Sequence, residues 1–156
     1  PPDTDGLIRE EDRRSLFMLG DFIRESFGRN LAEEAVLTVK PEKDRDGKDG
    51  SVLLKKGEET WFGNPDGLCE LEVEFTWAEE RCLNYLVVQE AIRFSQRVEQ
   101  FEVYCLDGQG CWKQIEKGTT VGYKRIVPLH GAPTKGLKLV ITDARVAPVL
   151  AFTGVY

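Results

Sequence analysis

The feature that most constrains the fold of this chain is a succession of short strand-like segments from residue 70 onward. Leu71, Val73 and Phe75 alternate with glutamates in the run CELEVEF, which predicts a strand with one buried and one solvated face. Turns that contain Gly, Asp or Pro separate the other strand candidates, which lie at residues 84–89, 98–106, 111–116, 123–129, 137–142 and 151–156. Because no helical stretch lies between them, we expect an all-β sandwich rather than a parallel α/β sheet.

Residues 7–30 show a helical period instead. Apolar residues recur there at three- and four-residue spacing, and they are Leu16, Phe17, Leu19, Phe22, Ile23 and Phe27. Gly28 and Asn30 follow, and both residue types accept the left-handed conformation at the end of a helix. The sequence therefore predicts one N-terminal helix whose apolar stripe needs a cover.

The segment PEKDRDGKDG, at residues 41–50, separates this helix from the strands. Its density of charges and glycines leaves little that could pack against a core. We expect it to be a solvated, mobile connection.

Composition excludes several classes of partner. The 156 residues carry a net charge of −6 with acidic and basic residues mixed along the chain, so there is no basic stripe to follow a phosphate backbone. Binding to nucleic acid is not expected. No stretch approaches the roughly 20 apolar residues that a membrane-spanning helix needs, so no membrane span is expected either.

The cysteines do not form a metal-binding pattern. Cys69, Cys82, Cys105 and Cys111 include no CxxC pair, and the single His130 lies far from them in the sequence. We therefore expect no metal site and no cofactor. Cys105 and Cys111 flank a turn and could face each other across a hairpin, but separate thiols are the favoured interpretation.

The sequence also lacks the signatures of an active site. It has no GxSxG elbow, no glycine-rich phosphate loop, no HExxH motif and one histidine. Catalysis would have to depend on carboxylates, and most of these lie on alternating strand faces and in solvated loops. No catalytic residue is expected in this chain.

The densest cluster of polar residues spans residues 89–98. Glu90 and Arg97 bracket a turn there, and an ion pair between them could fix that turn, because the guanidinium fork matches two carboxylate oxygens. We interpret this pair as structural. Arg125, in the later run GTTVGYKRI, could be structural or could donate to sugar hydroxyls.

A sugar-binding site on a β-sandwich needs an aromatic face and hydrogen-bonding side chains on neighbouring loops. Trp61 and Trp112 adjoin strands and are expected to lie in the core, whereas Trp77 and Tyr123 lie nearer to loop ends. His130 is predicted to lie in an exposed turn. The candidate substrate-binding residues are accordingly Trp77, Tyr123, Arg125 and His130, with core packing as the alternative for Trp77 and Tyr123.

Five segments together resemble the C-terminal part of retaining α-L-fucosidases. They are the opening PPDTDGLIREEDRRSLFMLGDFIRESFGRNLA, the run VLLKKGEETWF, the run QEAIRFSQRVEQFEVY, the run GTTVGYKRI and the ending DARVAPVLAFTGVY. The resemblance implies a discoidin or galactose-binding-like jelly roll at residues 35–156. It also implies that residues 1–34 form a helical segment that links the sandwich to an upstream catalytic barrel.

The resemblance implies a non-catalytic accessory domain of an enzyme that hydrolyses terminal α-L-fucose. Its expected partners are its own barrel and fucosylated or galactose-containing glycans, in the periplasm or outside the cell. The sandwich would be a weak carbohydrate-binding module, with a purely structural support for the barrel as the alternative. A third interpretation, a discoidin domain that adheres to protein or lipid, would need an apolar spike loop, which we do not find in the sequence. A module should expose a loop aromatic beside polar groups, whereas a support should bury its tryptophans and carry an apolar patch on one flank.

Two positions depart from the pattern that the resemblance implies. Many discoidin-like sandwiches hold calcium with acidic residues where this chain has Lys55, Lys56 and Ala151, so calcium is not expected. Ser95 stands in place of a glycine usual before Gln-Arg-Val. A turn would absorb this change if the φ angle of Ser95 were negative.

Overall fold

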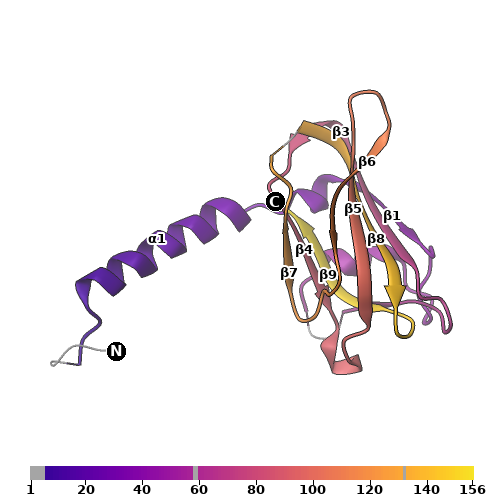
Figure 1. Cartoon of the computed structure of the whole chain (residues 1–156), viewed down its shortest axis with the longest axis horizontal. Coiled ribbons are helices and arrows are strands. Elements are labelled where there is room, and N and C mark those ends of the chain that lie inside the picture. The colour runs from indigo at the N-terminus through magenta and orange to yellow at the C-terminus, as the bar shows by residue number, and fades with distance from the viewer. Residues whose placement is uncertain (1–5, 58–59, 132) are drawn as a thin grey trace.

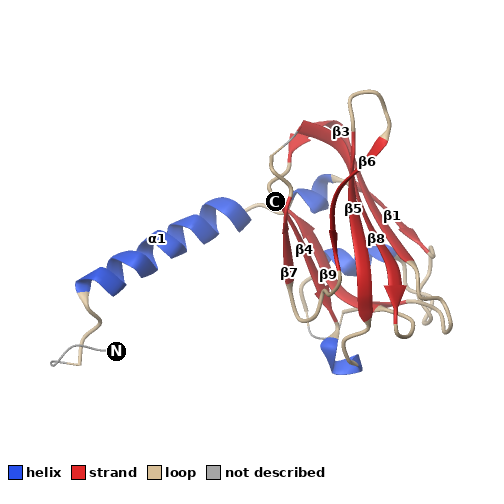
Figure 2. Ribbon diagram, viewed as in Figure 1, coloured by secondary structure: helices blue, strands red, loops and turns tan. Residues whose placement is uncertain are grey.

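The computed structural model describes residues 6–57, 60–131 and 133–156, which form one helix followed by a sandwich of two antiparallel sheets (Figures 1 and 2). The larger sheet has the order β1-β3-β8-β5-β6, whose bounds are Val36–Lys40, Leu71–Cys82, Pro133–Ala144, Val98–Leu106 and Trp112–Gly118. The smaller sheet has the order β2-β9-β4-β7, whose bounds are Phe62–Gly63, Val149–Val155, Tyr85–Glu90 and Arg125–Pro128. The predicted sandwich is confirmed.

The core lies between the inner faces of the two sheets. In the larger sheet Val73 pairs with Leu139, which pairs with Val103 on its other side, so all three side chains share the inner face. None of the three is exposed, and each such burial stabilises the fold by about 1.5–3 kcal/mol. The alternation in CELEVEF therefore reports the inner and outer faces of β3 as predicted.

Two strands were missed, and β3 and β8 are much longer than predicted. β1 is an edge strand that pairs with β3, and β2 has two residues that pair with β9. β3 and β8 each extend over 12 residues because they continue to pair with each other beyond a bulge, up to Cys82 and Pro133. These features arise from partner strands, which local sequence does not reveal.

Helix α1, Glu10–Phe27, begins with three acidic residues that interact favourably with its N-terminal dipole. It points away from the sandwich along most of its length (Figure 1). Only its last turn packs, where the ring of Phe27 lies 5.1 Å from that of Tyr85 and 5.2 Å from that of Tyr156. The predicted helix is confirmed, and the sandwich does not cover its apolar stripe.

The expected left-handed end of α1 was wrong. Gly28 has a φ of −71°, and glycine is required there because a Cβ would lie 2.4 Å from the carbonyl oxygen of Arg24. Asn30 is extended, and its side chain accepts the N–H groups of Ala32 and Val155 at 3.2 and 3.0 Å. The chain therefore leaves α1 through the short helix η1, Leu31–Glu34, which Asn30 ties to β9.

The expectation that residues 41–50 have nothing to pack was also wrong. Asp44 is buried, and one of its carboxylate oxygens accepts the N–H groups of Asp46 and Lys48, both at 2.8 Å. Gly50 is buried where the short helix η2, Gly50–Leu54, begins. Local carboxylate-to-backbone bonds organise this loop despite its charge.

Among the described residues no helix is both long and apolar enough to cross a bilayer.

Candidate functional site

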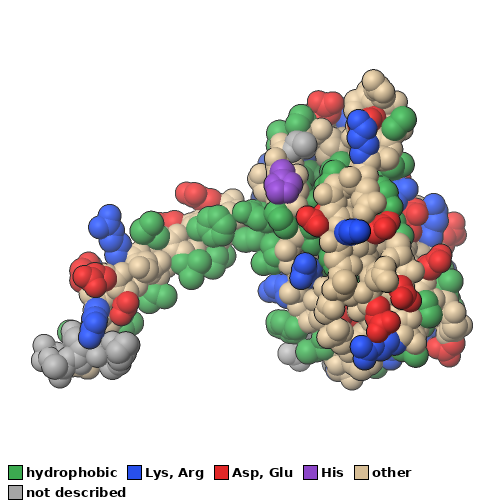
Figure 3. Space-filling view, viewed as in Figure 1, with side chains coloured by type: hydrophobic (Ala, Val, Ile, Leu, Met, Phe, Trp, Pro, Cys, Tyr) green, Lys and Arg blue, Asp and Glu red, His purple; other side chains and the backbone are tan. Residues whose placement is uncertain are grey.

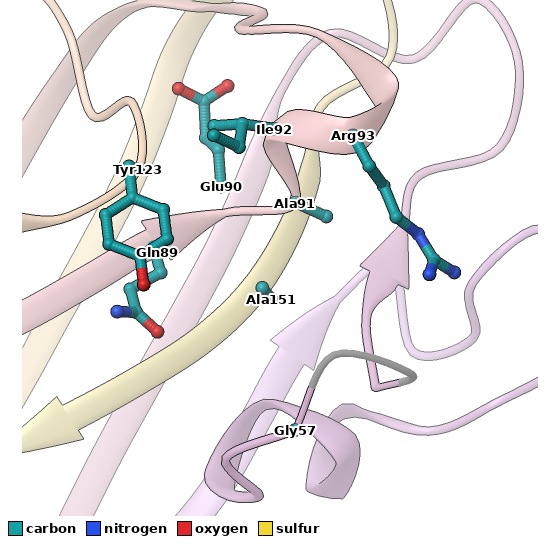
Figure 4. A pocket seen from close by; sticks show the side chains of 8 residues that line it. All are labelled: Gly57, Gln89, Glu90, Ala91, Ile92, Arg93, Tyr123 and Ala151. Carbon is teal, nitrogen blue, oxygen red and sulfur yellow. The ribbon is translucent and has the colours of Figure 1, made fainter.

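A hollow of about 430 Å³ opens beside the end of β4. Figure 4 shows Tyr123 and Gln89 on one side, Arg93 on the other, and Ala91 and Ala151 between them. Gly57, Glu90 and Ile92 complete the lining. The hollow thus combines a floor of small residues with aromatic and polar walls.

Glu90 fixes the two walls of this hollow relative to each other. Its buried carboxylate accepts the backbone N–H groups of Arg97 and Val98, at 2.7 and 3.0 Å, and that of Gly122 at 2.7 Å. The first two follow the short helix η3, Ile92–Phe94, and the third precedes Tyr123. These three backbone donors give both carboxylate oxygens of Glu90 a hydrogen-bond partner in the interior.

The predicted ion pair between Glu90 and Arg97 was wrong. The Arg97 guanidinium donates instead to the carbonyl oxygens of Phe94 and Ala147, at 3.0 and 2.7 Å. Glu90 does pin the turn, but through backbone amides. A turn presents several N–H groups at its inside, and these reach a buried carboxylate more closely than a long side chain does.

The guanidinium of Arg93 makes cation–π contacts with two aromatic rings. Its guanidinium carbon lies 4.1 Å from the ring centroid of Trp61 and 4.9 Å from that of Phe94. On the same indole, the Lys48 ammonium lies 4.4 Å from the centroid. Trp61, which we expected in the core, is therefore only partly buried and joins three segments of the chain by cation–π contacts.

The structure separates the four predicted substrate-binding residues. Only Tyr123 lines the hollow, and its side chain is 69% exposed. Trp77 is 5% exposed, and its indole N–H donates to the carbonyl oxygen of Leu31 at 3.0 Å, so as a sugar contact it was wrong. Arg125 lies exposed on β7, with its guanidinium 5.9 Å from the ring centroid of Phe101.

His130 occupies an exposed turn, as predicted, and its φ angle there is 59°. It lines a different hollow, with Asn84, Tyr85 and Pro128 of the sandwich and Glu25 of α1. Trp112 was expected in the core, but it is partly buried on β6 with the Lys138 ammonium 4.3 Å from its ring centroid. Neither residue contributes to the hollow beside Tyr123.

Gln89 and Arg93 are the polar lining residues that sequence reasoning missed. Both lie in the polar cluster at residues 89–98, which was the available signal. What the sequence could not show is orientation. On β4 the side chains of Leu86 and Val88 enter the core, so Gln89 faces outward beside Tyr123.

An apolar flank lies next to the hollow, on the outer face of the smaller sheet. Val87, Phe152 and Tyr156 pack there with Tyr85 and Phe27. Between α1 and this face runs a groove of about 400 Å³, and Ile23, Ile126 and Gln89 are among its lining residues. Because Gln89 lines both features, the hollow and the groove adjoin.

Helix α1 extends this flank with apolar side chains that the described part of the chain leaves largely exposed. Leu16, Leu19 and Ile23 share one face, whereas Phe17 and Met18 project about 100° and about 160° away from Leu16. All five are about half exposed or more. Figure 3 shows the hydrophobic side chains along α1 and at its junction with the sandwich. A helix that is apolar on several sides is normally buried among other elements.

The four cysteines are free thiols, so Cys105 and Cys111 are not bridged. Within the part of the chain that the structure describes, no three His, Cys, Asp or Glu residues are grouped as metal ligands.

No protein-family model matches the chain. Over 160 residues it is 28% identical to alpha-L-fucosidase 1 of Arabidopsis thaliana, and the match covers 100% of this chain and 32% of that protein. Among solved structures, a GH29 fucosidase of Ruminococcus gnavus in complex with fucose superposes with a TM-score of 0.86 at 26% identity. That match covers 100% of this chain and 32% of the fucosidase.

A more distant structure shares only the fold. Chitosan-binding module 1 from a chitosanase/glucanase of Paenibacillus superposes with a TM-score of 0.68 at 14% identity, over 82% of this chain and 98% of the module. The chain spans about a third of the length of the curated relatives that it matches, and it corresponds to their C-terminal part.

Proposed function

Because this chain is homologous to the C-terminal part of α-L-fucosidases, we propose that it is the accessory domain of an enzyme that removes terminal α-L-fucose from glycans. In this proposal the hydrolytic carboxylates belong to a preceding catalytic barrel. The sandwich, residues 35–156, supports that barrel, and residues 1–34 join the two. In this proposal the main role of the domain is structural, and the domain supplies no catalytic group.

The observation that carries this proposal is the uncovered apolar surface of α1 and the adjoining flank. Phe17 is 62% exposed and Phe22 is 49% exposed, yet both are large apolar side chains, and within the described residues the helix packs on the sandwich mainly through its last turn. Exposing such a surface to water is costly, so a partner is expected to cover it. The catalytic barrel is the one occupant to which homology points, because the matched relatives are about three times as long as this chain.

The distribution of apolar residues around α1 says how the partner covers it. A helix that merely lay on a surface would need one apolar face, whereas α1 carries Leu16, Phe17 and Met18 at well-separated angles. We infer that the catalytic barrel surrounds α1 on more than one side. The Phe27, Tyr85 and Tyr156 cluster then joins this embedded helix to the sandwich.

One variant tests this arrangement when it is compared in two contexts. Phe22→Asp is expected to leave the thermal unfolding of the 156-residue chain unchanged, because Phe22 touches little there. In the intact enzyme it is expected to lower both the unfolding temperature and the fucosidase activity, because a charge would enter an apolar interface. Val146→Asp replaces a 52% exposed apolar residue away from the flank and serves as the control. An equal effect of Phe22→Asp in both contexts would contradict the proposal.

A second candidate function is weak carbohydrate binding by the sandwich itself. The observation that favours it is the hollow where the exposed ring of Tyr123 stands beside Gln89 and Arg93. This is the arrangement expected of a discoidin or galactose-binding-like module with fucosylated or galactose-containing ligands. The buried Trp77 and the apolar flank support the structural role, and the two functions can coexist.

We also propose that the parent enzyme acts in the periplasm or outside the cell, a placement that depends on the family resemblance alone. Fractionation of the source cells, followed by detection of the enzyme with an antibody against this domain, tests it. Recovery in the periplasm or medium supports the placement, and recovery with cytosolic markers contradicts it.

A further inference from the structure

We propose that the groove between α1 and the outer face of the smaller sheet receives an acidic segment of the catalytic barrel, with one apolar side chain between two carboxylates. This inference depends on the proposed function for the identity of the partner. It adds to the surface of α1 a second contact surface, on the sandwich itself, and it states the chemistry that this surface selects. The groove has a volume of about 400 Å³.

The groove is apolar although it lies on the outer face of a sheet. Val87 pairs with Ile126 on one side and with Gly154 on the other, so these residues form a row across that face. Ile126 is 46% exposed, and Ile23 of α1, which also lines the groove, is 49% exposed. The outer faces of sandwiches normally carry polar residues. Exposed isoleucines in this place therefore indicate a face that a partner covers.

An aromatic surface on β9 positions one positive charge in the groove. A Cβ at Gly154 would lie 2.8 Å from the ring of Phe152 and 3.0 Å from that of Tyr156, so glycine lets both rings approach the backbone of the strand. The Lys56 ammonium lies 5.1 Å from the ring centroid of Phe152 and 5.9 Å from that of Tyr156. These cation–π contacts hold the ammonium beside an aromatic surface before any partner binds.

A second ammonium group lines the groove on the other side of β4. Lys124 directly precedes β7, whereas Phe152, which Lys56 contacts, belongs to β9, and β4 lies between these two strands (Figure 1). Neighbouring strands lie about 4.8 Å apart, so the backbones of β7 and β9 are separated by about 10 Å. An apolar side chain placed over Val87 of β4 would thus have an ammonium group on each side.

The charges of the groove select an acidic partner. Its described lining contains Lys56 and Lys124 and no acidic residue, although the whole chain carries a net charge of −6. Both lysines are exposed to solvent. A purely apolar partner would remove two ammonium groups from water without a counter-charge, which is costly. Carboxylates beside the apolar side chain offset this cost, so an acidic segment is favoured over a neutral or basic one.

Zero-length cross-linking of the intact parent enzyme with a carbodiimide tests the contact, because this reagent joins an amine to a carboxylate in direct contact with it. Peptide mass mapping is expected to find Lys56 and Lys124 joined to Asp or Glu residues of the barrel. Lys135, which is exposed on β8 of the larger sheet, measures the background. No links above this background would overturn the proposal. Links between two copies of the isolated 156-residue chain would also overturn it, because the occupant would then be a second copy.

A charge reversal gives a quantitative measurement of the same contact. In the intact enzyme Lys124→Glu should repel the acidic segment, so acetylation of the Lys56 amine should become at least about threefold faster, the effect of losing one exposed ion pair. In the isolated chain the same variant should leave this rate unchanged, because no barrel covers the groove. Because Lys124 is exposed, the variant should keep the fold. Lys135→Glu is the matched control and should leave the rate unchanged in both proteins.

The Phe22→Asp comparison separates this inference from the proposed function. If Phe22→Asp destabilises only the intact enzyme while Lys56 reacts equally fast in the intact enzyme and the isolated chain, the barrel covers α1 and leaves the groove open. The acidic contact would then be wrong, and the proposed function would stand. If Phe22→Asp also acts equally in both proteins, both proposals fail together.

Discussion

Glu90 and Gly122 bond each other in both directions. The Glu90 carboxylate accepts the Gly122 N–H at 2.7 Å, and the backbone N–H of Glu90 donates to the Gly122 carbonyl oxygen at 2.9 Å. This reciprocal contact ties the end of β4 to the loop between β6 and β7. It also fixes the position of Tyr123, which follows Gly122 directly.

Glu90→Gln is expected to lower the free energy of unfolding by about 2–4 kcal/mol, because a buried carboxamide nitrogen would face backbone N–H groups that need an acceptor. Urea unfolding of the 156-residue chain measures this change. Glu80→Gln removes the same charge at an exposed position on β3 and is expected to change stability little. Equal stability of the two variants would show that the Glu90 contacts do not hold the loops.

Ser95→Gly is expected to stabilise the chain. Ser95 has a φ of 78° and a ψ of 161°, a conformation that is nearly restricted to glycine. Glycine would remove the backbone strain of the folded state, and we expect this gain to exceed the cost of the larger conformational entropy that glycine gives to the unfolded chain. The net gain should be about 1 kcal/mol, seen as a higher urea midpoint. Ser95→Ala keeps the Cβ and is expected to gain nothing. A destabilised glycine variant would contradict the backbone assignment.

Two phenylalanines of α1 are expected to differ in their effect on the isolated chain. Phe27→Ser should cost about 2 kcal/mol, because the ring packs on Tyr85 and Tyr156. Phe17→Ser should change the free energy of unfolding by less than about 0.5 kcal/mol, because that side chain is largely exposed. Thermal unfolding of both variants tests the difference. A similar loss in both would mean that α1 packs along its whole length.

Thiol alkylation should distinguish the cysteines. Burial raises the pKa of Cys105 to about 11, so at pH 8 almost no reactive thiolate forms there. Cys82 and Cys111 are exposed and are expected to react with iodoacetamide first, as peptide mass mapping would show. In urea the cysteines should react at similar rates, because unfolding exposes the Cys105 thiol to solvent. Early modification of Cys105 in the folded chain would contradict its position in the sheet.

The elements that sequence predicted correctly are those whose signal is local. Alternation over Leu71–Phe75 and the helical period ending at Phe27 each report a single element's buried or apolar face. β1 and β2 were missed because they depend on pairing with β3 and β9, which lie elsewhere in the sequence. We expected the turn to tolerate Ser95 only if its φ angle were negative, and the φ angle is positive in the structure.

The candidate site was predictable only in part for the same reason. Tyr123 was identified because loop aromatics are general sugar contacts, and the polar cluster that contains Gln89 and Arg93 was recognised. Trp77 was misplaced because β3 continues past the predicted strand and carries it into the core. The role of Glu90 required knowledge of which backbone amides surround it.

Hydrogen exchange of the α1 backbone amides tests docking most directly, in the 156-residue chain and in the intact parent enzyme. In the isolated chain the amides of residues 14–22 should exchange rapidly, because this part of α1 has no tertiary cover. In the intact enzyme they should be slowed at least about a hundredfold, as the barrel surrounds the helix. Equal exchange in both proteins would contradict the docking role of this domain.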